Sequence, residues 1–240
     1  MHNQNNVEIE QRLEGYFASP KRKGSVPGVL VFMEAYGITG HIRGVCDRLA
    51  ESGFAALAPD FFHGELIPYA DGQAAMAKIP TLKDDVLLKE SVAGLDWLGK
   101  QPQVNGQALG VIGFCMGGRL AYLVNCRYPT RLKAAVGFYG GAIAPEAEGP
   151  DRFGRTPPIG ETAEMRAPLF LGYGADDQGI TAAEHGRVVN ALSAAKKRYT
   201  LNVYPGAGHA FLCEERANYA PAAAALGWRD AIAFLEAELG

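Results

Sequence analysis

Short apolar runs alternate along the chain with segments whose apolar residues recur every three or four positions. A continuous apolar run bounded by Gly, Pro or Asp predicts a strand that is covered on both faces of a sheet. Residues 7–17 differ, because apolar and polar residues alternate there and predict a half-exposed strand. The other predicted strands cover residues 28–33, 54–58, 108–112, 133–139, 168–173 and 199–204.

Helical spacing fills the intervals between these strands. Thr39 can cap a helix whose apolar face carries Ile42, Val45 and Leu49, and Gly53 ends it. Further helices are predicted over 88–100, directly after residue 115, over 181–192 and over 228–239. Two segments with several Gly and Pro residues are expected to be irregular, 61–80 and 142–166.

Strands that alternate with helices predict an α/β fold of three layers, in which helices cover both faces of a mostly parallel central sheet. The chain has 240 residues, of which 48% are hydrophobic and 20% are charged. These values fit a single globular domain over residues 1–240 with a sizeable core.

Charge and hydropathy argue against a nucleic-acid or a membrane partner. The formal net charge is −3 and charges of both signs are spread along the chain, so no nucleic-acid partner is expected. No apolar run approaches the ~20 residues that a membrane helix needs. The first six residues are polar and lack the apolar core of a signal peptide. We therefore expect a cytoplasmic protein with no membrane partner, as a monomer or a small homo-oligomer.

The four cysteines, Cys46, Cys115, Cys126 and Cys213, form no C-x-x-C pair, so neither a metal site nor a cofactor is predicted. Cys46 and Cys126 lie on apolar helix faces, where cysteine acts as a small hydrophobe. Cys115 is different, because it lies in Gly113-Phe114-Cys115-Met116-Gly117 between a predicted strand and a predicted helix. This G-x-C-x-G pattern is a nucleophile elbow with Cys in place of Ser.

Three more chemically active residues follow predicted strands, and the carboxyl ends of parallel strands share one edge of a sheet. Glu34, Asp177 and His209 each lie just beyond a strand, so they are expected near Cys115. Cysteine, aspartate and histidine occur in the chain order of an α/β-hydrolase triad. Asp176 is adjacent to Asp177, but the spacing to the next helix favours Asp177. The other histidines are expected to be solvated or locally bonded: His2, His41, His63 and His185.

These motifs together resemble the dienelactone hydrolase family, which has the α/β-hydrolase fold. The resemblance spans nearly the whole chain and is carried by five motifs. They are Met33-Glu34-Ala35-Tyr36-Gly37, Ala58-Pro59-Asp60, the elbow, Gly174-Ala175-Asp176-Asp177 and Tyr204-Pro205-Gly206-Ala207-Gly208-His209-Ala210-Phe211. The resemblance implies Cys115 as nucleophile, His209 as base and Asp177 as the orienting acid. It also implies a thiol-contacting role for Glu34 that holds the thiol at rest, and an oxyanion hole from the backbone N–H groups of Ala35 and Met116.

The chain departs from the family at two arginines that grip a substrate carboxylate. One family position, four residues after the base histidine, is Cys213 here, and residues 64–100 contain no arginine for the other. Arg119 and Arg216 are candidate substitutes. Tyr36, Phe61 and Tyr139 are expected as pocket walls.

The resemblance implies a hydrolase that cleaves a small ester or lactone through a thioester acyl-enzyme. One alternative is a non-catalytic small-molecule-binding protein on a hydrolase fold. Another is a glutamine amidotransferase-like cysteine enzyme, whose local H-x-E motif is not matched by His209-Ala210-Phe211. Turnover of a simple ester that depends on Cys115 distinguishes the hydrolase from both.

Overall fold

The computed structural model describes residues 2–10 and 13–240. An eight-stranded sheet has the strand order β1-β2-β4-β3-β5-β6-β7-β8. Its strands are β1 His2–Glu10, β2 Leu13–Pro20, β3 Val26–Phe32, β4 Ala55–Pro59, β5 Val104–Phe114, β6 Ala134–Phe138, β7 Leu169–Gly174 and β8 Tyr199–Tyr204. The pairs β1–β2 and β2–β4 are antiparallel, and the remaining neighbours are parallel.

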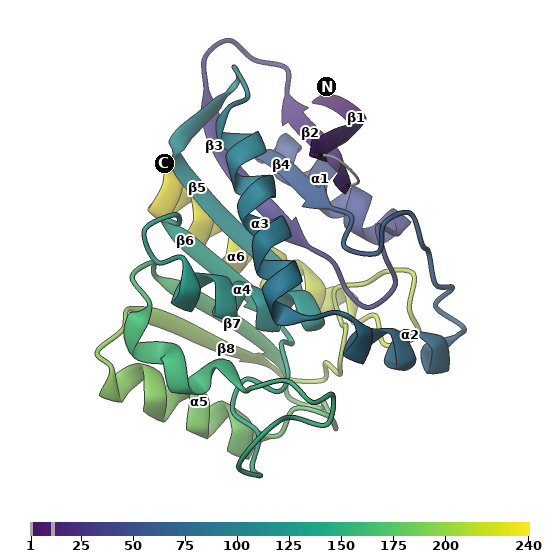
Figure 1. The fold of residues 1–240 in the computed structure, drawn as a ribbon, viewed down its shortest axis with the longest axis vertical. Helices are drawn as coiled ribbons and strands as arrows, with labels where there is room; N and C mark the ends of the chain where they lie inside the picture. Colours follow the sequence, from purple (N-terminus) through teal and green to yellow (C-terminus); the bar gives the residue numbers. More distant parts are fainter. Residues whose placement is uncertain (1, 11–12) are drawn as a thin grey trace.

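Helices lie on both faces of this sheet (Figure 1). In that view α3 and α4 lie in front of the strands, and α6 lies behind them. The helices are α1 Gly40–Glu51, α2 Gly72–Lys78, α3 Asp84–Gly99, α4 Met116–Arg127, α5 Ala182–Ala194 and α6 Pro221–Leu239, with 3₁₀ turns η1 Ile79–Thr81 and η2 Pro158–Glu164. The predicted three-layer α/β architecture is confirmed. Within the described ranges, no helix combines the length and the apolar character needed to cross a membrane.

Two local sequence signals determine where the helix after β3 begins and ends. The Thr39 side chain accepts a hydrogen bond from the Ile42 N–H and caps α1, as predicted. Ile42, Val45 and Leu49 are fully buried against the sheet. Gly53 follows the end of the helix with a positive φ of 96°, which glycine adopts without a steric penalty.

Two segments differ from the prediction. Residues 7–17 were predicted as one strand, but β1 ends at Glu10 and β2 begins at Leu13, and the two pair antiparallel. Residues 11–12 of that segment lie outside the described residues. Alternation has a period of two in both arms of a hairpin, so it reveals strand conformation but not the reversal. Residues 61–80 were predicted as irregular, yet they contain α2, which the Asp71 side chain caps by accepting a hydrogen bond from the Ala74 N–H.

Candidate active site

Cys115 lies on the sharp turn between β5 and α4. Its φ of 55° and ψ of −116° fall in a region that non-glycine residues rarely adopt. The Cys115 N–H donates to the carbonyl of Phe138 at the end of the neighbouring strand β6 (3.0 Å), which helps to hold this conformation. Backbone strain of about 1–3 kcal/mol that the surroundings maintain is typical of functional turns.

The glycines that frame the elbow permit very close backbone contacts. A Cβ on Gly113 would lie 2.0 Å from the carbonyl oxygen of Gly117, so only glycine fits. A Cβ on Gly117 would lie 2.3 Å from the carbonyl oxygen of Phe32, the last residue of β3. The first turn of α4 therefore packs directly on the backbone that leads from β3 into Glu34.

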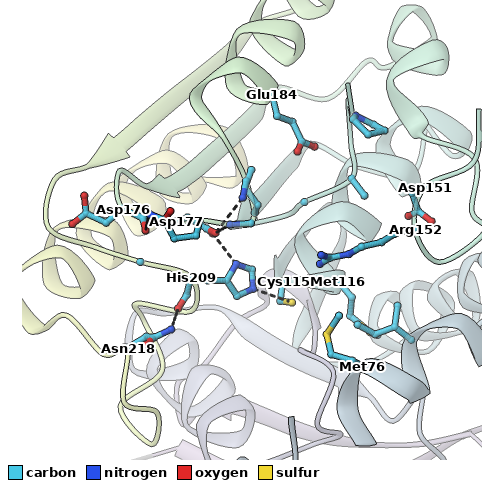
Figure 2. Close-up of a pocket in the computed structure, with 18 of the residues that line it drawn as sticks. Met76, Cys115, Met116, Asp151, Arg152, Asp176, Asp177, Glu184, His209 and Asn218 are labelled. Carbon is cyan, nitrogen blue, oxygen red and sulfur yellow. Dashed lines mark hydrogen bonds and ion pairs between the residues drawn. The ribbon is translucent and has the colours of Figure 1, made fainter. Parts of the chain in front are cut away.

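The Cys115 sulfur contacts an imidazole that in turn contacts a carboxylate. His209 Nε2 lies 3.2 Å from Cys115 Sγ, and His209 Nδ1 lies 2.8 Å from Asp177 Oδ2. Figure 2 shows this chain of contacts at one wall of a cavity. The structure thus brings together three residues that are 32 to 94 positions apart in sequence.

Asp177 is fixed by its own neighbours. Its Oδ1 accepts hydrogen bonds from the N–H groups of Gly179 (2.8 Å) and Ile180 (3.2 Å), which leaves Oδ2 for His209. Burial raises the pKa of Asp177, but the hydrogen bond from His209 and these two amides lower it below its usual value. Asp176, the adjacent candidate, is exposed and forms no hydrogen bond or ion pair with His209 in the described part of the chain.

Burial and the neighbouring groups shift the pKa of His209 in opposite directions. Burial lowers the pKa of His209, but the Cys115 sulfur and the Asp177 carboxylate raise it to about 10. The Asn218 side-chain amide donates to the His209 carbonyl oxygen (3.2 Å) and ties its loop to the following segment. These two neighbours therefore favour the protonated imidazole that forms when His209 takes up a proton.

The backbone N–H groups expected to form an oxyanion hole lie on adjoining segments. Met116 is the first residue of α4, and the opening N–H groups of a helix have no partner inside it. Ala35 follows Glu34 after β3, beside the contact that Gly117 makes with Phe32 and Met33. The positive end of the α4 dipole also lies at this point.

Glu34 is almost completely buried, with 1% of its side chain exposed. Neither carboxylate oxygen has a hydrogen-bond partner among the described residues, so the expected contact with the Cys115 thiol is not formed as a hydrogen bond. The nearest cation is Arg216, whose Nη1 lies 3.8 Å from Glu34 Oε1. Burial raises the pKa of the Glu34 carboxyl, while the charges of His41 and Arg216 oppose that rise.

The cavity in front of Cys115 has a volume of about 810 Å³. Tyr36, Phe61 and Tyr139, which were expected as its walls, are buried and do not line it. Tyr139 packs beside the His209 ring, with centroids 5.2 Å apart, so it supports the base from behind. The residues that do line the cavity come mainly from loops, and they include Met76, Ile79, Pro145, Phe153, Ile180 and Tyr219.

Arg152 is a cavity residue that the sequence did not single out. It is exposed, and its guanidinium points toward Cys115 and Met116 (Figure 2). The guanidinium carbon lies 4.9 Å from the centroid of the Phe153 ring, and no carboxylate within the described ranges lies at ion-pair distance from it. Its segment has no hydrophobic period, so no sequence signal could have placed it at the site.

The two arginines proposed from the sequence have other partners. Arg119 is buried and donates to both carboxylate oxygens of Asp84 (2.8 and 2.9 Å) and to the Thr156 carbonyl. It therefore anchors α4 to its neighbours and is unavailable to a substrate. Arg216 lies against Glu34 and over the Tyr36 ring, 5.1 Å from its centroid, and it does not line the cavity.

Among the remaining cysteines and histidines, the burial of the cysteines matches the prediction and that of His41 does not. Cys46 and Cys126 are buried in α1 and α4, as predicted, and Cys213 is buried as well. His41 was expected to be solvated or bonded locally, but it is fully buried and pairs with Glu214, 173 residues away. A local pattern cannot reveal a partner at that separation.

Comparison with known proteins agrees with this fold. The model of the dienelactone hydrolase family matches residues 13–239. A Synechocystis protein named "Putative carboxymethylenebutenolidase" is 32% identical over 234 residues, covering 95% of this chain and 93% of the relative. A Bradyrhizobium protein named "Probable 2-oxo-3-(5-oxofuran-2-ylidene)propanoate lactonase" is 32% identical over 229 residues, covering 94% and 89%.

A solved structure with a similar fold also comes from a protein named as a dienelactone hydrolase. The crystal structure of a "Putative Dienelactone Hydrolase" from Klebsiella pneumoniae superposes with a TM-score of 0.89 at 29% identity, and the match covers 98% of this chain and 99% of that one. The family match extends over nearly the whole chain, from β2 to the end of α6. The chain therefore belongs to the dienelactone hydrolase family and is a hydrolase with the α/β-hydrolase fold.

Proposed function

We propose that this hydrolase cleaves a small carboxylic ester or lactone by covalent catalysis, with Cys115 as nucleophile, His209 as base and Asp177 as orienting acid. The observation that carries the proposal is the line of contacts from Cys115 Sγ to His209 and on to Asp177, at the wall of a cavity of about 810 Å³. Nucleophile, base and orienting group within hydrogen-bond reach are the signature of nucleophilic catalysis.

The reaction starts with proton transfer from the Cys115 thiol to His209 Nε2. The sulfur attacks the carbonyl carbon, and the tetrahedral intermediate collapses to a thioester as His209 returns the proton to the leaving oxygen. Water then gives a proton to His209 and attacks the thioester, which releases the acid and restores the thiol. Asp177 keeps the imidazole in the tautomer that presents Nε2 to the sulfur.

Charge develops on the carbonyl oxygen in both tetrahedral intermediates. The N–H groups of Ala35 and Met116 are the proposed donors to this oxygen. In comparable sites, removing one oxyanion donor costs about 3 kcal/mol of transition-state stabilisation. Both are backbone groups on adjoining segments, so the close packing of Gly117 on the end of β3 supports their alignment.

Glu34 is the proposed partner of the thiol in the resting enzyme, and Arg216 is its alternative partner. The 3.8 Å separation between Arg216 Nη1 and Glu34 Oε1 supports a carboxylate that is drawn away from the sulfur. A glutamate that moves between the thiol and a guanidinium would change the reactivity of Cys115.

The substrate class follows from Arg152. An arginine without a carboxylate partner, pointing into the cavity, supports a substrate that carries its own carboxylate. The Bradyrhizobium relative is named for such a molecule, a furanone-ylidene propanoate. We therefore propose an acidic lactone or half-ester as the substrate.

We expect Arg152→Gln to raise the KM for mono-p-nitrophenyl succinate about tenfold, because one charge-assisted hydrogen bond to the free carboxylate is lost. The KM for p-nitrophenyl acetate, which lacks that carboxylate, should change less than about twofold. Arg166→Gln is the matched control, since Arg166 is also exposed and does not line the cavity. Equal effects of Arg152→Gln on both esters would rule out carboxylate recognition.

The catalytic proposal is tested by alkylation. Cys115 is the one cysteine of the four that is not buried, so iodoacetamide should modify it selectively. We expect the protein to hydrolyse p-nitrophenyl acetate and to lose that activity in proportion to alkylation of Cys115. Full alkylation with unchanged turnover would contradict the mechanism.

A further inference from the structure

The loop that carries Arg152 is held together by the side chain of Asp151. Asp151 Oδ1 accepts hydrogen bonds from the N–H groups of Phe153 (2.8 Å) and Arg155 (2.9 Å). The backbone closes the same loop, because the Asp151 N–H donates to the Arg155 carbonyl (2.8 Å) and the Gly154 N–H donates to the Asp151 carbonyl (2.8 Å). These five residues therefore form one compact turn around the Asp151 carboxylate.

The second oxygen of that carboxylate binds a guanidinium. Asp151 Oδ2 accepts a hydrogen bond from Arg155 Nε (3.0 Å) and lies 2.9 Å from Arg155 Nη2, and the two side chains are only 1% and 10% exposed. Burial raises the pKa of Asp151, but the hydrogen bonds and the charge of Arg155 lower it below its usual value. Removing one partner of such a buried pair leaves the other charge uncompensated, so the structure of the loop depends on both.

Phe153 connects this ion pair to Arg152. The guanidinium carbon of Arg155 lies 5.1 Å from the centroid of the half-buried Phe153 ring, and that of Arg152 lies 4.9 Å from the same centroid. A guanidinium at this distance from an aromatic ring is held by cation–π attraction. The Asp151 carboxylate binds both the Phe153 N–H and the Arg155 side chain, so it also fixes the ring on which Arg152 lies.

Arg152 is the residue of this loop that Asp151 leaves free. Within the described ranges, none of the hydrogen bonds to the Asp151 carboxylate comes from Arg152, although the two residues are adjacent. The Arg152 guanidinium extends toward Cys115 instead (Figure 2), and both Arg152 and Phe153 line the cavity. By occupying the carboxylate, Arg155 keeps Asp151 from neutralising Arg152.

The far end of the loop is anchored to the helix of the nucleophile elbow. The buried Arg119 donates to the Thr156 carbonyl (2.7 Å) and pairs with Asp84, the first residue of α3. Arg119 lies near the start of α4, which begins at Met116. The loop is therefore attached to the helix that begins directly after Cys115.

We propose that Asp151 is a positioning residue for substrate recognition: its carboxylate, paired with Arg155, holds Arg152 over the cavity and leaves that guanidinium free to bind a substrate carboxylate. This inference rests on the proposed function, because it requires that Arg152 binds the substrate carboxylate. Asp151 acts through Arg152, so it should determine which ester is preferred and leave the chemical step unchanged.

The test compares two esters that differ in a free carboxylate, mono-p-nitrophenyl succinate and p-nitrophenyl acetate. We expect Asp151→Asn to raise the KM for the succinate ester about fivefold or more, and to leave kcat and KM for the acetate ester within about twofold. In an Arg152→Gln background, Asp151→Asn should change the ratio of the two KM values less than about twofold, because the group through which it acts is absent.

Arg155→Gln is a second variant, which removes the ion pair but leaves the Asp151 carboxylate to accept from the Phe153 N–H. It should raise the KM for the succinate ester in the same way, even if Asp151→Asn does not fold. Glu161→Gln is the matched control, because Glu161 also lies after β6 and pairs with an arginine, Arg127, but does not line the cavity. It should leave both KM values within about twofold.

The order of the loop can be measured without turnover. Amide hydrogen exchange, followed for single residues by NMR, should be at least about tenfold faster at Phe153 and Gly154 in Asp151→Asn and Arg155→Gln than in the wild type. Glu161→Gln should leave these exchange rates unchanged. Neither result depends on ester hydrolysis.

An unchanged KM for the succinate ester in both loop variants would overturn the proposal, even if exchange is faster. A raised KM without faster exchange would also contradict it, because the loop would then be ordered without the ion pair, and so would an equal loss of selectivity in the Arg152→Gln background. If Arg152→Gln alone raises the KM for the succinate ester, only this proposal fails. If Arg152→Gln has no selective effect, carboxylate recognition fails as well.

Discussion

Replacing Cys115 by alanine is expected to lower kcat/KM for p-nitrophenyl acetate by roughly 10³-fold or more. The variant keeps the cavity and the oxyanion donors but has no sulfur to form the thioester. In hydrolases with a triad, loss of the nucleophile removes most of the acceleration, and the residual rate comes from the oxyanion hole and binding. Alanine keeps the Cβ of Cys115 and removes only the sulfur, so it makes the same demand on the positive-φ backbone after β5, and we expect the variant to stay folded.

The control for this substitution is Cys126→Ala, in the helix α4 that begins directly after Cys115. Cys126 is buried in α4 and does not line the cavity, so its removal should lower stability by about 1–2 kcal/mol and leave kcat/KM within about twofold. Thermal unfolding and initial rates on the same samples separate the two effects. A Cys115→Ala variant that retains the wild-type rate would contradict covalent catalysis by this residue.

Replacing Asp177 by asparagine is expected to lower kcat about 10²–10⁴-fold with little change in the fold. The amide keeps the shape of the carboxylate, and its oxygen can still accept from Gly179 and Ile180. Its NH₂ group would then face His209 Nδ1 as a donor, which favours the tautomer that carries the proton on Nε2. That tautomer cannot accept the thiol proton, so the base function is lost.

Asp176→Asn provides a closely matched comparison. The two residues are adjacent and both line the cavity, but Asp176 is exposed while Asp177 contacts His209. Both variants remove one negative charge at nearly the same place. Asp176→Asn should therefore retain kcat within about twofold. Equal losses in the two variants would show that local charge, rather than imidazole orientation, sets the rate.

The elbow could be predicted because several local rules coincide there. An apolar strand, a glycine frame and a new apolar helix specify one backbone path, and the structure explains the frame by the close contacts of Gly113 and Gly117. The residues at the other strand ends could be predicted for a similar reason, since parallel strands deliver their carboxyl ends to one edge. The fold class therefore brought Asp177 and His209 to Cys115.

Other parts of the site depend on contacts that no periodicity encodes. Arg152 lies in a loop whose sequence carries turn residues but no hydrophobic pattern, so no period in the sequence predicts its direction. His41 occupies an apolar helix face, where the sequence does not distinguish a packed imidazole from a charged one. Tyr139 was expected at the cavity surface, but its neighbours His209 and Phe211 cover it.

The most direct test of the account is to trap the acyl-enzyme. The protein would be mixed with p-nitrophenyl acetate, quenched in acid within the first turnovers, digested and analysed by mass spectrometry. We predict one acetyl group, attached to the sulfur of Cys115 and released by hydroxylamine. Efficient turnover with no acetyl group on Cys115 at any quench time, or an acetyl group on another residue that turns over at the catalytic rate, would contradict a Cys115 thioester.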